Sequence, residues 1–119
     1  MSGMTDEKCL EAALKAEGYK VEVGTSLTIN SGYGTSKVQI KLPKDSGAGN
    51  RYEAGFTKDK EGNLNLVKES MDYKLNDDWK KKIKQSYTRQ KAIQLARAKG
   101  LKLAQEVRKN GKISLVFNT

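Results

Sequence analysis

Several lysines repeat along one face of a predicted helix, at a spacing that suits a row of phosphates. At 100° per residue Lys80, Lys84 and Lys91 fall on one arc of that helix, and Lys81 lies beside it. A lysine that meets a phosphate releases condensed counterions, which favours binding without base specificity. The predicted C-terminal hairpin adds Lys102, Arg108, Lys109 and Lys112, which could extend the patch if the hairpin lies beside the helix. The residues that we expect to contact a polyanion are Lys80, Lys81, Lys84, Lys91, Lys109 and Lys112.

The net charge is divided unequally along the chain. Residues 80–119 hold twelve Lys/Arg and one acid, Glu106, a formal +11, whereas residues 1–79 carry a formal −2 within a total of +9. So local an imbalance favours a polyanionic partner, either a nucleic acid or an acidic protein surface. The charge alone leaves open a second interpretation, in which the basic face is simply solvated and keeps the protein soluble.

Catalytic and metal-binding patterns are weak. The chain has no histidine, so it lacks the commonest general base and metal ligand. The acidic pairs Asp6/Glu7 and Asp77/Asp78 begin predicted helices, where they oppose the helix dipole. Cys9 falls in an apolar stripe and is expected to be a small buried hydrophobe. We therefore predict a protein that is not an enzyme and that has no metal and no cofactor, and we infer no small-molecule substrate for it.

Two glycine-rich loops, residues 32–36 and 46–50, could hold an anion on backbone N–H groups. Neither has the spacing of a phosphate-binding loop, and neither opens a predicted helix. We interpret both as turns. Tyr33, between two glycines, is either an exposed contact residue or an anchor for loop packing.

Apolar spacing predicts the elements of the first two thirds of the chain. A helix of about twelve residues is expected after a Thr5 cap, with Gly18 as its stop. A short strand at 21–23 precedes residues 24–36, a stretch that is rich in Gly, Ser and Thr. Alternation predicts a half-buried strand at 37–42, a loop follows at 43–50, and two strands at 52–57 and 63–68 form a hairpin.

A long second helix is predicted from the Asn76 cap to about Ala98, with its end at Gly100. Its core face is expected to hold Trp79, Ile83, Tyr87 and Ile93. Leu95 falls among the lysines instead, which predicts an exposed leucine or a bend in the last turns.

The last two strands, 101–108 and 112–117, form a predicted hairpin around Asn110-Gly111. Asn-Gly is typical of a two-residue turn, which would place Ile113 opposite Arg108. A three-residue loop pairs apolar residues with each other, Val107 with Ile113 and Leu103 with Phe117. We predict the three-residue loop, with Gly111 in the left-handed conformation.

These elements predict one α+β domain over residues 1–119, with a mainly antiparallel sheet, two helices packed on one face, and a C-terminal β-hairpin. The longest apolar runs are too short to span a membrane, and no signal-peptide pattern is present. One cysteine fits a reducing compartment. We expect a cytoplasmic protein that does not bind membranes.

Several short motifs along the chain together resemble one known family: residues 10–22, Gly32-Tyr33-Gly34, 52–56, Glu61-Gly62, Trp79, Gln85 and Tyr87. The chain resembles the hypothetical chloroplast reading frame thirty-five family, a cyanobacterial, plastid and phage domain of unknown function. The resemblance implies a shared α+β fold and no reaction. Ser86 and Arg89 depart from the family's Gln-Arg-Tyr-Ala-Tyr stretch.

The resemblance also suggests an alternative function. The family usually opens with a strand before the first helix, but here only residues 1–4 precede Thr5, so we expect that strand to be shortened or absent. A sheet edge would then be open to a partner strand. Our first hypothesis is a non-catalytic basic module that binds nucleic acid. The second is a protein–protein adaptor or accessory subunit that uses the sheet edge and the basic face.

Overall fold

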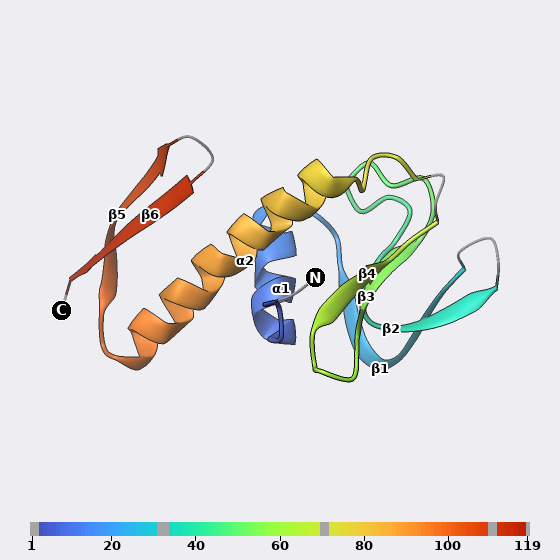
Figure 1. The fold of residues 1–119 in the computed structure, drawn as a ribbon, viewed down its shortest axis with the longest axis horizontal. Coiled ribbons are helices and arrows are strands. Elements are labelled where there is room, and N and C mark those ends of the chain that lie inside the picture. The colour runs from blue at the N-terminus through green and yellow to red at the C-terminus, as the bar shows by residue number, and fades with distance from the viewer. Residues whose placement is uncertain (1–2, 31–33, 70–71, 110–111, 119) are drawn as a thin grey trace.

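The computed structural model describes residues 3–30, 34–69, 72–109 and 112–118. The long helix α2 crosses the molecule between a four-stranded sheet and a separate hairpin, which stretches the shape to 50 × 29 × 24 Å (Figure 1). The elements in chain order are α1 (Glu7–Ala16), β1 (Glu22–Asn30), β2 (Thr35–Leu42), β3 (Ala54–Lys58), β4 (Leu64–Val67), α2 (Asp77–Ala98), β5 (Lys102–Lys109) and β6 (Lys112–Asn118).

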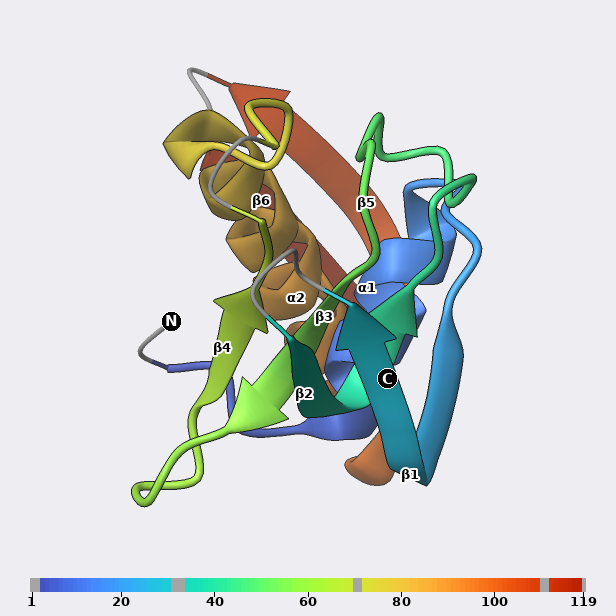
Figure 2. The same cartoon turned by 90° about the vertical axis from the view of Figure 1, so that its right-hand side faces the viewer.

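The main sheet has the strand order β1-β2-β3-β4, and every neighbouring pair is antiparallel. Both helices lie on the same face of this sheet, as Figure 2 shows. Among the described strands, β5 and β6 pair only with each other, as a second, two-stranded sheet beside α2. The α+β class, the antiparallel sheet and the C-terminal hairpin predicted from the sequence are confirmed.

The core fills the space between the helices and the inner face of the sheet. Leu10 and Leu14 of α1 and Phe56 of β3 are completely buried there. Trp79 at the start of α2 stacks between Tyr19 and Phe56, with ring centroids 6.3 and 6.4 Å away. Aromatic pairs at this separation add to the free energy of burying their area, so this stack fixes the N-terminal half of α2 against the sheet.

Helix α1 begins one residue later than expected. Asp6, not Thr5, is the cap, and its carboxylate accepts hydrogen bonds from the N–H groups of Lys8 and Cys9 at 3.0 and 3.2 Å. A threonine hydroxyl can also accept hydrogen bonds from these amide groups, but only the carboxylate adds a negative charge that opposes the helix dipole. The helix has ten residues instead of about twelve, and Gly18 follows it with a φ of +87°.

Helix α2 agrees closely with the prediction. Asn76 caps it, with the side-chain oxygen 3.0 Å from the Trp79 N–H, and the helix ends at Ala98. Trp79, Ile83 and Tyr87 are buried, as the apolar periodicity indicated. Ile93 is only half-buried, because this part of α2 extends beyond the sheet. Leu95 is 53% exposed among the lysines.

Strand β1 is much longer than the predicted strand at 21–23. It continues to Asn30, into the stretch that is rich in Gly, Ser and Thr. A bulge lies between Val23 and Leu27, where the register with β2 shifts. An edge strand that is exposed on most of its length needs no apolar alternation, so the sequence pattern gave no signal for it. Gly32 and Tyr33 lie outside the described residues.

The hairpin register differs from the prediction of a three-residue loop. Lys109 pairs with Lys112 and Arg108 with Ile113, which leaves Asn110-Gly111 as a two-residue connection. The preference of Asn-Gly for a tight turn therefore outweighs apolar pairing near the turn. A bulge between Leu103 and Gln105 then restores the expected partners Leu103 and Phe117. The predicted conformation of Gly111 lies outside the described residues.

The two edges of the main sheet differ in how far they are covered by other residues. No strand precedes α1 within the described residues, but the Met4 carbonyl accepts a hydrogen bond from the Leu64 N–H of β4 at 2.7 Å, and the Met4 side chain is fully buried. Met4 thus covers part of the β4 edge. β1 forms the opposite edge, and its residues are mostly exposed.

Candidate polyanion-binding surface

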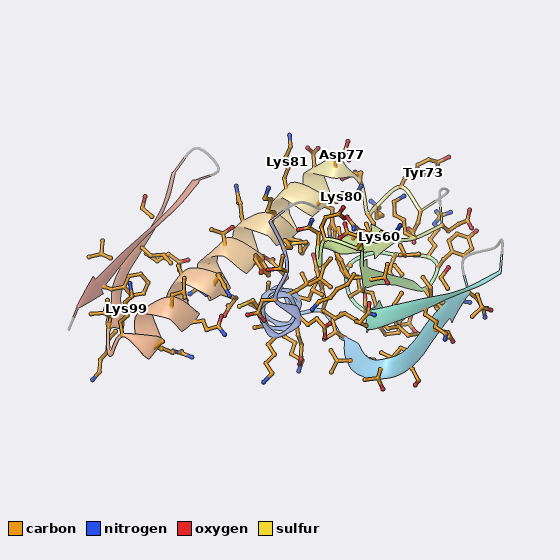
Figure 3. All side chains as sticks on the ribbon, turned by 60° about the horizontal axis from the view of Figure 1, so that its bottom comes forward. Lys60, Tyr73, Asp77, Lys80, Lys81 and Lys99 are labelled. Atoms are coloured by element: carbon orange, nitrogen blue, oxygen red, sulfur yellow. The ribbon has the colours of Figure 1, made fainter. Side chains whose placement is uncertain are left out.

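The solvent side of α2 carries exposed lysines near its start, and another follows its end. Lys81 and Lys84 are exposed near its start, and Lys99 follows its last turn. Lys81 points away from the body of the molecule, and Lys99 lies at the opposite end of the helix (Figure 3). Within the described part of the chain, none of these three ammonium groups forms an ion pair. Their charges are therefore available to an external anion.

Lys80 and Lys82 are less available, because each meets an acid. Lys80 Nζ lies 3.7 Å from the Asp77 carboxylate one turn earlier, a pair in which Asp77 is almost fully exposed. Such exposed pairs stabilise little and break readily for a better partner. Lys82 Nζ lies 3.5 Å from Glu17 and 3.3 Å from the Tyr19 hydroxyl, at the C-terminal end of α1. We therefore keep Lys80 in the candidate surface, whereas Lys82 contributes to packing.

Lys91 has a structural partner that the sequence did not reveal. Its ammonium lies 3.1 Å from Asp6 Oδ2, the carboxylate that caps α1. The Tyr87 hydroxyl accepts hydrogen bonds from the Thr5 and Asp6 N–H groups at 3.2 and 3.0 Å. Side chains one turn apart on α2 thus hold the start of α1, and Lys91 belongs to this helix–helix contact.

The contact between the helices shifts three ionisation equilibria. Burial raises the pKa of Asp6, but the hydrogen bond from the Cys9 N–H and the Lys91 ammonium outweigh it, so the pKa of Asp6 is below its ordinary value. The hydrogen bond to Asp6 raises the pKa of Lys91. Burial, with the Asp6 charge, raises the pKa of Cys9, which keeps the buried thiol protonated and unreactive at neutral pH.

We expect Asp6→Asn to lower the free energy of unfolding by about 0.5–1 kcal/mol at pH 7, because the amide still caps α1 but loses the ion pair with Lys91. A carboxylate with a lowered pKa stabilises the fold above its unfolded pKa of about 3.9, and this contribution is lost as the pH falls through the folded pKa. The difference from wild type should therefore shrink as the pH falls through the folded pKa of Asp6, which lies below the unfolded value. Urea unfolding at several pH values measures it, with the exposed Asp45→Asn as a control. A difference that does not depend on pH would contradict the ion-pair explanation.

The two lysines predicted in the hairpin lie opposite each other at its closed end. Lys109 ends β5, Lys112 begins β6, and the two residues pair directly across the hairpin. Their side chains lie outside the described part. The hairpin turns back from the C-terminal end of α2 (Figure 1). The structure thus gathers Lys80, Lys81 and Lys84 near the start of α2, while Lys109 and Lys112 lie on a separate element.

A second group of cations lies near the end of α2, and of its members sequence reasoning named only Lys102, as a possible extension of the lysine surface. Arg97 and Lys102 are exposed and line a hollow between α2 and the hairpin, together with Arg89, whose Nε donates a hydrogen bond to Glu106. The helical spacing of Arg89 and Arg97 was visible in the sequence. The position of Lys102 beside them was not, because it depends on how the chain turns back after Leu101.

The loop at 46–50 closes on its own polar groups. Asn50 Nδ2 donates to the carbonyls of Pro43 and Tyr52 at 3.0 and 2.8 Å, and Ser46 Oγ donates to Asn50 Oδ1 at 2.6 Å. The interpretation of this segment as a structural turn agrees with these contacts.

No set of three His, Cys, Asp or Glu side chains gathers as metal ligands would among residues 3–30, 34–69, 72–109 and 112–118. No helix in these ranges has the length and apolar character needed to cross a membrane.

The fold and the surface together define a small α+β domain with one long, lysine-bearing helix. The chain belongs to the family described as protein of unknown function (DUF1257), whose family model matches residues 13–116. Neither a curated protein nor a solved structure matched the chain. The description of this family names no activity, so membership assigns none to this chain.

Proposed function

We propose that this protein is a non-catalytic basic binding module whose partner is a nucleic acid, contacted through its phosphates. The observation that carries the proposal is the solvent side of α2, where Lys81 and Lys84 are exposed without an ion pair in the described part of the chain. The charge of the C-terminal part supports it, with a single acid after residue 79. The contact residues proposed are Lys80, Lys81, Lys84, Lys109 and Lys112.

Salt dependence tests the proposal. Five phosphate contacts predict a slope of about −4 in a plot of log affinity against log salt concentration. We expect the purified protein to bind labelled single-stranded RNA, single-stranded DNA or duplex DNA with this slope between about 50 and 200 mM salt, and with a micromolar Kd at the higher salt. Complete loss of binding at the higher salt would mean only generic attraction between charges and would overturn the proposal.

The open edge of β1 favours one alternative, a protein–protein adaptor. β1 is nine residues long and mostly exposed, it contains neither lysine nor proline, and the order of the sheet leaves it without an outer neighbour among the described strands. Proteins usually protect such an edge, so an extended segment of a partner could pair with it. Co-purification with one protein, in place of a nucleic acid that nuclease removes, would favour this alternative.

Within the family, we also propose that the chain belongs to the branch called hypothetical chloroplast reading frame thirty-five. The support is the short run of motifs in the sequence, above all Tyr52-Glu53-Ala54-Gly55-Phe56 and Trp79. Ala54–Phe56 begin β3, and Trp79 lies in the first turn of α2. The motif residues of β3 and α2 therefore meet in the core, where Phe56 stacks on Trp79.

A further inference from the structure

A hollow of about 390 Å³ lies between the C-terminal half of α2 and the hairpin. This volume is within the range of small-molecule sites. Ile93 lies in its wall and follows Lys84 by nine residues, which at 100° per residue places it on the opposite side of the helix. The hollow is thus separate from the lysine surface, and an inference about it does not depend on the proposed function.

Its charged residues are cationic. Arg97 and Lys102 line it and form no ion pair in the part of the chain that the structure describes. Arg89 also lines it and is hydrogen-bonded through Nε to Glu106, which leaves the other end of the guanidinium for a ligand. None of the lining residues is acidic. An anion bound here would face at least two cations without a competing carboxylate in the wall.

The remaining wall is largely apolar. Ile93, Leu101 and Phe117 are each half-buried and line the hollow, and Gln90 adds an amide. Phe117 also lines the neighbouring hollow of about 250 Å³ beside Thr88 and Ala92, so this side chain borders two hollows. A flat apolar group that entered the hollow could stack on Phe117 and remove apolar surface from water.

We propose that this hollow binds a small organic phosphate, with the phosphate on Arg97 and Lys102 and a flat apolar group against Phe117 and Ile93. A phosphate monoester carries a charge between −1.5 and −2 at pH 7. Two cations therefore neutralise a phosphate monoester better than they suit a carboxylate, which has a single negative charge. The guanidinium of Arg97 offers paired donors for two phosphate oxygens, and Lys102 supplies a point charge.

The test compares phenyl phosphate, benzoate and inorganic phosphate on the full chain, followed by NMR of the Ile93 and Leu101 methyl groups. We expect phenyl phosphate to shift these signals saturably, and to bind at least about tenfold more tightly than inorganic phosphate or benzoate. The apolar ring accounts for the tighter binding relative to inorganic phosphate. The second negative charge accounts for the tighter binding relative to benzoate. No saturable shift up to about 10 mM phenyl phosphate would overturn the proposal, and so would equal affinities for phenyl phosphate and inorganic phosphate.

Two matched variants separate this site from general positive charge. Arg97→Gln should weaken phenyl phosphate at least about tenfold, because a charge-assisted contact is lost. Lys99→Gln removes the same charge from an exposed position two residues away that does not line the hollow, and should leave the affinity unchanged. Arg97 is exposed, so the variant is expected to fold, and circular dichroism checks this. An equal loss in both variants would reduce the effect to net charge and overturn the site.

Discussion

Replacing Lys80, Lys81 and Lys84 together with glutamate is expected to lower nucleic-acid affinity at least about 100-fold at about 50 mM salt. Three phosphate contacts become three repulsions, and the slope of log affinity against log salt should become less negative by about 3. The loss should be similar for different base sequences, because these contacts read no bases. Fluorescence anisotropy on two unrelated oligonucleotides measures it. Lys91 is left unchanged because it binds Asp6.

A control with the same change in net charge is available in the sheet half of the chain. Lys20, Lys37 and Lys44 are exposed and form no ion pair among the described residues. Their replacement with glutamate should weaken binding far less, since they lie outside the α2 surface. If the two triple variants lose the same affinity, net charge alone explains binding. Unchanged affinity in the α2 variant would exclude this helix as the site.

Gly55→Ala is expected to lower the free energy of unfolding by about 3 kcal/mol. Gly55 is buried in β3, and a Cβ atom there would lie 2.6 Å from the Ile40 carbonyl oxygen and 2.8 Å from Val38 Cγ1. The carbonyl belongs to the neighbouring strand β2 and cannot move without disturbing the sheet. Overpacking of this kind costs about 1–3 kcal/mol, and a rigid backbone contact places it at the upper end. Urea denaturation followed by circular dichroism measures the change.

The same substitution at Gly24 provides the control. Gly24 lies in β1, its φ is not positive, and the nearest side-chain atom to an added Cβ is Leu27 Cγ at 3.4 Å, an ordinary contact. Gly24→Ala should change the free energy of unfolding by less than about 0.5 kcal/mol, since the methyl group meets no clash. Equal stability of the two variants would contradict the close approach of β2 and β3 at Gly55.

Local patterns explain which elements could be predicted. The Asn76 cap, the end of α2 near Gly100 and the buried Trp79 follow from interactions within a few residues, and each is confirmed. β1 was predicted too short because its exposed stretch carries no apolar alternation. The hairpin register was wrong because two local preferences competed, and the bulge beside Leu103 that reconciles them has no sequence signal of its own.

The sequence by itself determined the α+β class, the long basic helix and the charge imbalance of its C-terminal part, because these depend on composition and on periodicity along the chain. Only the tertiary structure decided the roles of individual charges. Lys91 meets Asp6 across 85 residues, and Arg97 lies beside Lys102 at a hollow that α2 and the hairpin share. Which cations are paired and which face solvent depends on how α1 and the hairpin pack against α2, and helical spacing along α2 alone cannot give that packing.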